Sequence, residues 1–379
     1  MKPTSPPSDP RTTTAPATRN PAAPPSPRRL FAVAVAAVLL ALGMTLSFGY
    51  ADHDPRPHDV RVAVAAPPQV GARVAAGLRH ADPGAFDVVR VPDAGTARRS
   101  VRAQSSAAAF VVPRGGPATI LTAGAEGTLQ QQVVTAAFTA VSHAIHRPLS
   151  HADVVPLSAG DRSGLSSFVF GLGLLIPSVI GSVGLFLLGL RQRLWWRVGA
   201  GIVFAVLAAC AGVLALDTIL GALTGSPAAL IGIGVLGALS FVLFVAALQA
   251  LVGLPGTALA AVAIVFVGNA ISGGSVPVAF LPDGFRQIAP WLPNNAIIRG
   301  ARDVIYFNGN DLGHPLLVLG LWPAVALGVL VAVDLLHLSE RRRASEAVAD
   351  VYRTPAVVHV RRRLRGSAAG GRRDVTPAR

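Results

Sequence analysis

Five long apolar runs in the second half of the chain constrain its fold more than any other feature. The runs are residues 165–190, 198–220, 228–252, 257–276 and 315–338. Each has close to the ~20 residues that an α-helix needs to cross the hydrocarbon core of a membrane. A further uncharged run covers residues 30–50. The sequence therefore predicts an α-helical membrane protein with six transmembrane helices.

Composition and the placement of charge favour the same topology. Only 14% of the residues are charged, against about 25% in a soluble domain. The net charge is +14, and most basic residues lie in residues 1–29, in 191–197 and after 340. If residues 30–50 are the first span, all three regions face the cytoplasm, as the positive-inside rule requires. This pattern favours contact with anionic membrane lipid over nucleic-acid binding.

We therefore expect a multi-pass plasma-membrane protein with both termini in the cytoplasm. Residues 1–29, rich in Pro, Ser, Thr and Ala, are typical of a disordered cytoplasmic tail, and 339–379 form a second, basic tail. The turn at 253–256 is the weak point of the topology, because it carries no charge to orient it and its loss would invert everything after it.

The first apolar run has a second interpretation. Arg28-Arg29 resembles a twin-arginine signal, and residues 49–51 resemble a cleavage site. The run is longer than the 7 to 15 apolar residues of a typical signal peptide. We expect an uncleaved first span.

Residues 51–164 have the pattern of an α/β domain. Short runs rich in Val, Ala, Ile and Phe predict strands at 60–66, 86–91, 107–112 and 118–123. Helix-like stretches lie at 69–80, 94–105 and 128–145. Because this segment lies between the first and second spans, we expect an extracytoplasmic α/β domain inserted between them.

Residues 281–313 interrupt the apolar runs with a helical hairpin that is too charged to cross a membrane. Pro282 begins a short helix, and Asn294-Asn295 is expected to cap a second one. One face of the second helix is apolar. The other carries Arg299, Arg302, Asp303 and Tyr306, and we expect this amphipathic pair to lie re-entrant or on the outer surface, with Trp291 and Tyr306 at the membrane interface.

Two acidic residues lie within the apolar runs. Asp217 is near the outer end of the third span and Asp334 near the inner end of the sixth. Acids inside a membrane serve in proton relays, but near a span end a wetted boundary residue is the commoner case. Proton-driven transport would depend on these two residues.

Several other residues carry weaker hypotheses. Cys210, the single cysteine, is expected to be a small packing residue. Four histidines suggest a metal site, but no cysteine or well-spaced carboxylate completes a ligand set, so none is expected. They are His80, His143, His146 and His151. Glycines in the spans allow helix backbones to approach closely, within one bundle or in a dimer. They are Gly181, Gly184, Gly232, Gly234, Gly237, Gly268, Gly273 and Gly274.

An enzymatic function finds no motif to support it. The only lysine is Lys2, so the chain has no Walker A loop, which needs a Lys after its glycines. Neither a nucleophile elbow nor a zinc-protease helix is present. We expect no catalytic residue and no cofactor, and any ATP hydrolysis would belong to a separate subunit.

One span, an outer α/β domain and five further spans resemble an ABC-2 type exporter permease. The chain is most similar to the phage-infection-protein (Pip/YhgE-like) group. The similar residues are Leu281-Pro282, Pro290 to Pro293, Ala301-Arg302, Tyr306-Phe307 and the segment "DVVPLSAGDRSGLSSF" at 153–168.

The resemblance implies a dimerising permease subunit, as a homo- or heterodimer, that moves a lipid, drug or envelope-related amphiphile outward. It also implies a separate ATP-binding partner, although the Pro-rich tail replaces the amphipathic helix that such a partner usually contacts. The loop with Arg191, Arg193 and Arg197 then remains as the coupling surface. The alternative is a non-transporting scaffold or receptor whose outer domain binds a partner.

Overall fold

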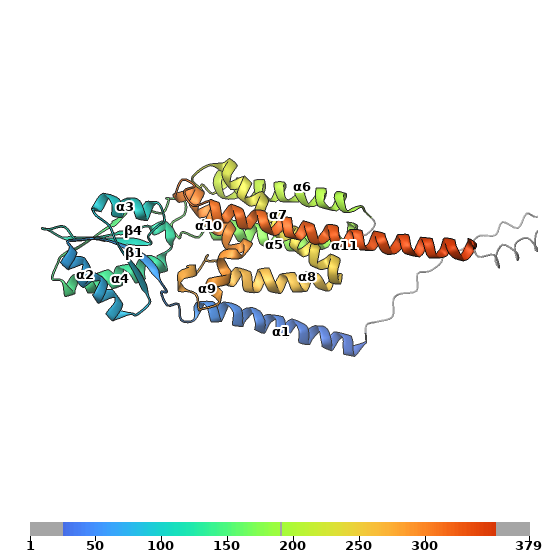
Figure 1. The fold of residues 1–379 in the computed structure, drawn as a ribbon, viewed down its shortest axis with the longest axis horizontal. Coiled ribbons are helices and arrows are strands. Elements are labelled where there is room, and N and C mark those ends of the chain that lie inside the picture. The colour runs from blue at the N-terminus through green and yellow to red at the C-terminus, as the bar shows by residue number, and fades with distance from the viewer. Residues whose placement is uncertain (1–25, 190–191, 354–379) are drawn as a thin grey trace, which may run out of the picture. The chain divides into compact units, whose positions relative to one another are not determined.

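The computed structural model describes residues 26–189 and 192–353. Residues 1–43 and 44–379 form two compact units. The described part of the first unit is the beginning of helix α1 (Pro27–Asp52), whose apolar run contains no charge from Leu30 to Tyr50. All other described elements belong to the second unit (Figure 1).

A five-stranded sheet forms the centre of an α/β domain in the second unit. Its strands follow the order β2-β1-β3-β4-β5, and neighbouring strands are parallel except β3 and β4. The strands are β1 (Val60–Ala65), β2 (Phe86–Arg90), β3 (Ala108–Val111), β4 (Ala118–Thr122) and β5 (Leu149–Asp153). The helices are α2 (Pro68–Ala81), α3 (Ala94–Arg102) and α4 (Thr128–Ala144).

Helices cover both faces of this sheet. Val62 and Val64 of β1 pack in one core with α2 and α4, where Phe110 and Phe138 stack with ring centroids 4.8 Å apart. Ala63 of β1 belongs to a second core with α3. The central strands β1 and β3 are therefore buried on both faces and consist almost wholly of apolar residues, as parallel strands between two helix layers do.

Strand β5 was not predicted. Its sequence, "LSHAD", has neither an apolar run nor an alternating pattern, and it pairs with one neighbour only, β4. An edge strand buries less side-chain surface than a central one, so a polar sequence can occupy it.

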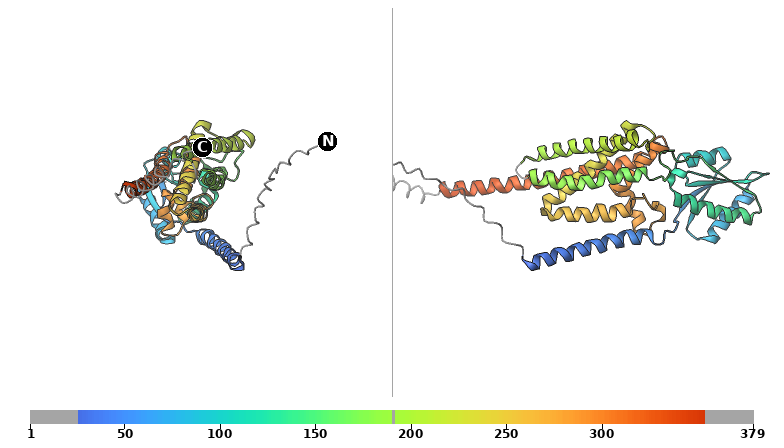
Figure 2. Two further views of the ribbon diagram at one scale, coloured as in Figure 1. Left: turned by 90° about the vertical axis from the view of Figure 1, so that its right-hand side faces the viewer. Right: turned by 180° about the vertical axis from the view of Figure 1, so that it is seen from behind.

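Apolar helices form a bundle beside the α/β domain (Figure 2). They are α5 (Ser166–Gly189), α6 (Leu194–Val213) with its π-helical end η2 (Leu214–Ile219), α7 (Pro227–Val252), α8 (Pro255–Ala260) with its π-helical continuation η3 (Ala261–Gly268), and α11 (Gly313–Arg353). Helix α7 lies at the centre, in contact with α5, α6, α10 and α11. More than half of its most apolar window is buried.

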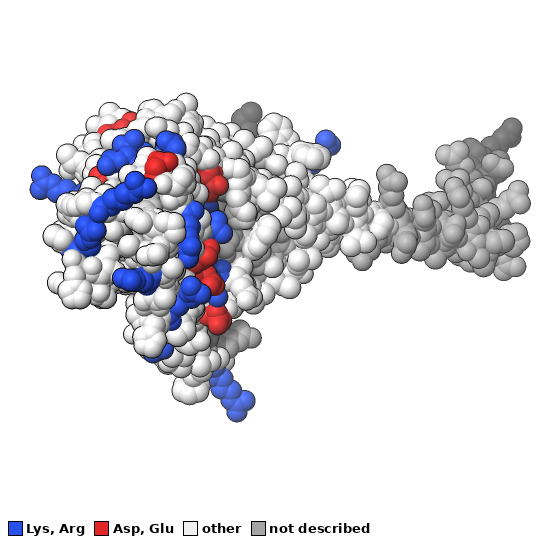
Figure 3. Space-filling view, turned by 60° about the vertical axis from the view of Figure 1, so that its left-hand side comes forward, with Lys and Arg blue, Asp and Glu red and all other residues white. Residues whose placement is uncertain are grey.

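Four helices among the described residues are long and apolar enough to cross a membrane: α5, α6 with η2, α7 and residues Gly313–Ser339 of α11. The structure is thus compatible with a membrane protein. Two further apolar segments, Ala37–Asp52 and Pro255–Gly268, are shorter. Figure 3 shows the charged side chains gathered on the α/β domain and at its junction with the bundle, whose visible surface is mostly uncharged.

The predicted span at 257–276 is wrong in its last part. The π-helix η3 ends at Gly268, and residues 271–276 form turns and bends. Gly273 has a positive φ of 78° there, a conformation that glycine adopts without a steric cost. Ile271 and Val276 are apolar because they are buried in the core shared with the α/β domain.

Helix α11 also extends further than the predicted span, since it continues through residue 353 into the expected basic tail. Cys210 is exposed on α6, so its expected role in packing is wrong. The expected tail at 1–29 falls almost entirely outside the described residues, as does 354–379.

The helix glycines divide into close contacts and open positions. A Cβ built on Gly234 lies 2.9 Å from the Ala209 Cβ and 3.0 Å from the Phe170 ring, so this glycine is needed for packing inside the bundle. A Cβ on Gly184 or Gly232 meets nothing within 4 Å. A side chain at either position would therefore meet no other described residue.

This difference predicts opposite effects of the same substitution in α7. Gly234→Ala should lower the free energy of unfolding by about 1 kcal/mol or more, because overpacking forces neighbours to shift. Gly232→Ala should raise it by about 0.5 kcal/mol, since alanine loses less backbone entropy in a helix. Unfolding of the detergent-solubilised protein, followed by tryptophan fluorescence, measures both; equal effects would contradict the packing described.

Candidate functional site

The second helix of the predicted hairpin, α10 (Pro293–Tyr306), is the centre of the candidate site. It follows the short helix α9 (Phe285–Ile288) and the 3₁₀ turn η5 (Ala289–Trp291). Leu292 is extended, with φ −91° and ψ 142°, as expected for a residue before proline. Pro293 therefore sets the start of the helix.

The expected Asn cap is wrong. The residue before the helix is Leu292, which makes no side-chain capping bond. Asn294 and Asn295 lie inside the first turn, where Asn294 Nδ2 donates to the Ile264 carbonyl (3.0 Å) and Asn295 Nδ2 to the Ser272 carbonyl (2.9 Å). The two amides thus attach α10 to η3 and to the irregular segment after it.

Two residues on the polar face of α10 are buried rather than lying at an outer surface, whereas the side chain of Arg299 is 43% exposed. Arg302 is 9% exposed and Asp303 is 0% exposed. Helix α10 contacts α5, α7 and α11, and the α/β domain lies against its other side. A position on the outer surface, one of the two expected for this helix, is therefore wrong for Arg302 and Asp303, because the α/β domain covers the face that the pattern assigns to solvent; the re-entrant position stays a prediction.

Trp291 does lie at an exposed position, with 52% of its surface accessible. Its ring makes an edge contact with His314, with centroids 5.2 Å apart. Its carbonyl accepts a hydrogen bond from Trp322 Nε1 at 2.8 Å. These contacts join η5 to the beginning of α11.

Tyr306 connects the hairpin to the segment before α5. Its hydroxyl donates to Asp161 Oδ2 at 2.7 Å. Asp161 also accepts from the backbone N–H groups of Leu165 (3.0 Å) and Ser166 (3.2 Å), which are otherwise without a helical partner at the start of α5. Burial, and then the hydrogen bond to Asp161, raise the pKa of Tyr306 to about 12. The phenol therefore remains a donor at every physiological pH.

Asp303 is a buried carboxylate with one partner. Its Oδ2 accepts a hydrogen bond from the Asp311 N–H at 2.9 Å, whereas its Oδ1 has no partner among the described residues. Burial raises the pKa of Asp303 above its ordinary value, against the opposing effect of that hydrogen bond. Folding therefore favours the neutral form of this carboxyl relative to the unfolded chain.

The raised pKa predicts how Asp303→Asn changes stability with pH. The wild-type carboxyl contributes most to the free energy of unfolding when the pH is below its pKa in the unfolded chain. This contribution is lost as the pH rises through its higher pKa in the folded protein. Asparagine is neutral throughout, so the variant should unfold at a temperature at or above that of the wild type at pH 7, with a smaller difference at pH 4. Thermal unfolding at both pH values tests this, with the exposed Asp82→Asn, which removes no ion pair of the described chain, as control. A variant that is clearly less stable at pH 7 would contradict it.

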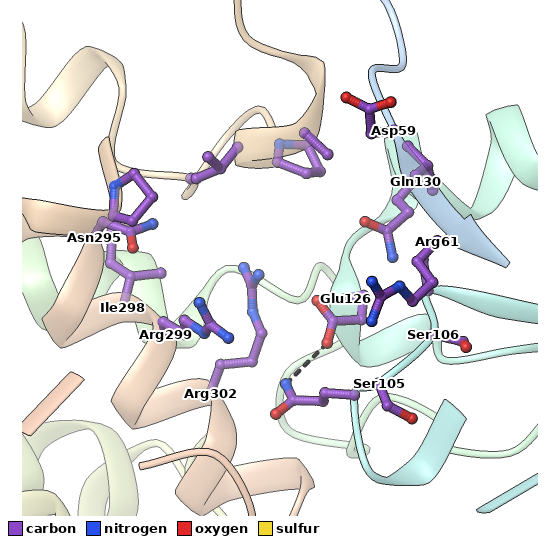
Figure 4. Close-up of a pocket in the computed structure, with 18 residues that line it drawn as sticks. Asp59, Arg61, Ser105, Ser106, Glu126, Gln130, Asn295, Ile298, Arg299 and Arg302 are labelled. Carbon is purple, nitrogen blue, oxygen red and sulfur yellow. Dashed lines mark hydrogen bonds between the residues drawn. The ribbon is translucent and has the colours of Figure 1, made fainter. Parts of the chain in front are cut away.

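A cavity of about 280 Å³ lies between α10 and the α/β domain (Figure 4). The side chain of Arg302 points into it, beside that of Arg299. Arg299 forms an ion pair with Asp311. Across the cavity, Glu126 accepts a hydrogen bond from Gln104 Nε2 at 2.9 Å. The α/β domain also supplies Asp59, Arg61, Ser105, Ser106 and Gln130.

The sequence indicated Arg299 and Arg302 of α10 as site residues, but it did not indicate the residues that the α/β domain contributes to this cavity. Glu126 lies in the short 3₁₀ helix η1 (Gly124–Glu126) and Gln104 in the turn after α3. Both positions are more than 170 residues from Arg302 in the chain. Only the packing of the α/β domain on α10 brings them together, and no sequence pattern indicates it.

The other candidate residues lie away from this cavity. Arg191 is outside the described residues. Arg193 immediately precedes α6, and the stem of Arg197 packs against Gly189. Asp217 is half-buried in η2 and Asp334 is exposed on α11. Neither acid takes part in an ion pair of the described chain.

Among the described residues, the histidines do not form a cluster that could hold a metal. No group of three or more His, Cys, Asp or Glu side chains with a suitable geometry occurs in the part of the chain that the structure covers. His151 Nε2 lies 2.8 Å from Thr122 Oγ1. This bond lies between the edge strand β5 and its neighbour β4.

No protein-family model matches the chain, and no significant match was found among the curated proteins. The function must therefore be argued from the arrangement of its residues.

Proposed function

We propose that the chain is an integral membrane permease subunit of an ABC-2 type exporter that moves an amphiphile outward. The observation that carries the proposal is α10, a helix with two buried ionisable side chains, Arg302 and Asp303, at one end of an apolar bundle. Burying such groups beside transmembrane helices costs free energy, so they typically mark a substrate path. Their position before α11 agrees with the resemblance seen in the sequence.

The proposed topology has six spans: α1, α5, α6 with η2, α7, α8 with η3, and α11. It places both termini and residues 190–197 in the cytoplasm and the α/β domain outside the cell. The short α8 segment fits this arrangement if α9, η5 and α10 complete the outer part of the bundle. The protein would be a multi-pass protein of the plasma membrane and would form a dimer.

Thiol labelling tests this topology. With Cys210 replaced by Ser, a single cysteine at Ala72 of α2 should react with a membrane-impermeant maleimide in intact cells. A single cysteine at position 344 should react only after the membrane is opened. Labelling of position 344 in intact cells would contradict the proposed orientation.

Transport requires an energy source, and we propose a separate ATP-binding subunit that contacts the loop at 190–197. Replacing Arg191, Arg193 and Arg197 together by Gln should abolish co-purification of this subunit and substrate-stimulated ATP hydrolysis in proteoliposomes. The matched control removes the same charge from exposed positions of the α/β domain, by Arg73→Gln, Arg90→Gln and Arg98→Gln. If no ATP-binding protein co-purifies with the wild type and no amphiphile moves, the proposal fails.

A second candidate function is a non-transporting receptor or scaffold whose outer domain binds a partner. It is favoured by the cavity between the α/β domain and α10, because a binding site at such a junction can report on a ligand without moving it. The two proposals differ in proteoliposomes: a receptor binds its ligand on the outer side with no flux.

A further inference from the structure

Arg302 is a buried cation that has no partner among the described residues. It is 9% exposed, and its Nε makes no hydrogen bond. The other arginines of the cavity are paired: Arg61 with Asp87 at 3.2 Å, and Arg299 with Asp311. Arg302 takes part in no ion pair of the described chain.

An unpaired charge that has lost most of its water is costly, so buried arginines normally meet an anion. Asp303 is next to Arg302 in sequence, but its Oδ2 accepts from the Asp311 backbone, and it forms no ion pair with Arg302. The guanidinium of Arg302 is instead directed into the cavity (Figure 4). The planar fork of arginine is suited to bind a carboxylate or phosphate through two hydrogen bonds.

Glu126 supplies the opposite charge on the far side of the cavity. It belongs to η1, and its Oε1 accepts one hydrogen bond from Gln104. No ion pair within 4.0 Å joins it to Arg302 or to another cation of the described chain. A bound ligand can therefore lie between an unpaired cation and an unpaired anion.

Neutral polar groups complete the lining. Gln130, 8% exposed, extends from α4, and Asn295 lies on α10. Ser105 and Ser106 add hydroxyl groups from the loop before β3. The volume of about 280 Å³ is just below the range typical of drug-sized ligands, so the cavity suits a small molecule or a headgroup.

We infer that this cavity binds a zwitterion, whose oxyanion lies against Arg302 and whose ammonium group lies against Glu126. The oxyanion is a phosphate or a carboxylate, and the ligand is either a free small molecule or the headgroup of a lipid. This inference goes beyond the proposed function, because the binding site requires neither transport nor an ATP-binding subunit.

Calorimetric titration of the full chain in phosphatidylcholine nanodiscs tests the inference. The probes are phosphoethanolamine, β-alanine, inorganic phosphate and phosphocholine, which has no N–H donor. We expect phosphoethanolamine or β-alanine to bind. Inorganic phosphate and phosphocholine should both bind at least tenfold more weakly, because neither can donate an ammonium hydrogen bond to Glu126, and loss of one hydrogen bond to a charged group lowers affinity by about tenfold or more.

Variants identify the two binding groups. Arg302→Gln should weaken binding of the zwitterion at least tenfold. Arg302→Lys should bind with intermediate affinity, since it keeps the charge without the fork. Glu126→Gln should bind phosphoethanolamine no better than phosphocholine. Arg98→Gln removes an exposed charge outside the cavity and should bind as the wild type does.

Nanodiscs that contain phosphatidylethanolamine distinguish a lipid headgroup from a free small molecule as the ligand of the cavity. If the lipid headgroup occupies the cavity, the apparent affinity for the soluble probe should fall in these nanodiscs, and otherwise it should not change. The inference is overturned if no zwitterionic probe binds, if inorganic phosphate binds as tightly as both zwitterions, or if a folded Arg302→Gln keeps wild-type affinity. If Arg302→Gln does not fold, unchanged selectivity of Glu126→Gln overturns it. None of these results depends on whether the chain transports a substrate.

Discussion

Gly225→Ala should lower the free energy of unfolding by about 3 kcal/mol or more. Gly225 lies in the loop before α7, with a φ of 122° that costs a residue with a side chain about 1–3 kcal/mol. A Cβ at this position would also lie 2.6 Å from the Val304 carbonyl oxygen, so the loop and α10 would have to separate. Thr224, the preceding residue, donates to the neighbouring Ile305 carbonyl at 3.3 Å, and this contact would weaken as well.

Gly221→Ala is the matched control in the same loop. Gly221 also has a positive φ, of 60°, but a Cβ there meets no atom within 4 Å. Gly221→Ala should lower the free energy of unfolding by only about 1 kcal/mol, which is the cost of placing a residue with a side chain in the left-handed conformation. Thermal and denaturant unfolding of the purified variants compares them, and similar losses would show that the loop does not pack against α10 as described.

Asp161→Ala should cost about 3 kcal/mol of stability. Asp161 is 5% exposed, and it accepts the Tyr306 hydroxyl and two N–H groups at the start of α5. Loss of hydrogen bonds to a charged group costs about 1.5–3 kcal/mol, and loss of a helix N-terminal acceptor adds about 1 kcal/mol. We expect the substitution to loosen the connection between α5 and the hairpin.

Tyr306→Phe separates the two effects of Asp161. It removes the hydroxyl and leaves the N-terminal acceptor, so we expect a smaller loss of about 1.5 kcal/mol. Because both substitutions remove the same hydrogen bond, the double variant should be little less stable than Asp161→Ala. Additive losses would show that Tyr306 and Asp161 act independently.

The sequence predicted the elements whose apolar pattern matches their burial. Val60, Val62 and Val64 alternate toward one core of the sheet, and the apolar runs of α5 and α7 are single helices. The pattern failed where tertiary contacts replace solvent. The polar side of α10 indicated a surface, but Arg302 and Asp303 are covered.

Local rules failed at the start of α10 for a related reason. Asparagine is favoured at the residue before a helix, but Pro293 begins the helix, so the residue before it is Leu292, two positions earlier than Asn294. The amides of Asn294 and Asn295 then bond carbonyls of residues 264 and 272, which no local rule predicts. For the same reason the sequence indicated only the α10 residues of the candidate cavity. Glu126 lies opposite Arg302 because two parts of the chain that are distant in sequence pack together.

Helix α11 connects α10, which lines the cavity, to residues at its own far end. Six residues separate it from α10, which it contacts, and it is helical from Gly313 to Arg353 (Figure 1). The part after Ser339 adds 14 residues, about 21 Å at 1.5 Å per residue. A movement of α10 on ligand binding would therefore reach one end of a helix whose other end lies beyond Ser339, and Pro323 inside it is the position at which this helix can bend.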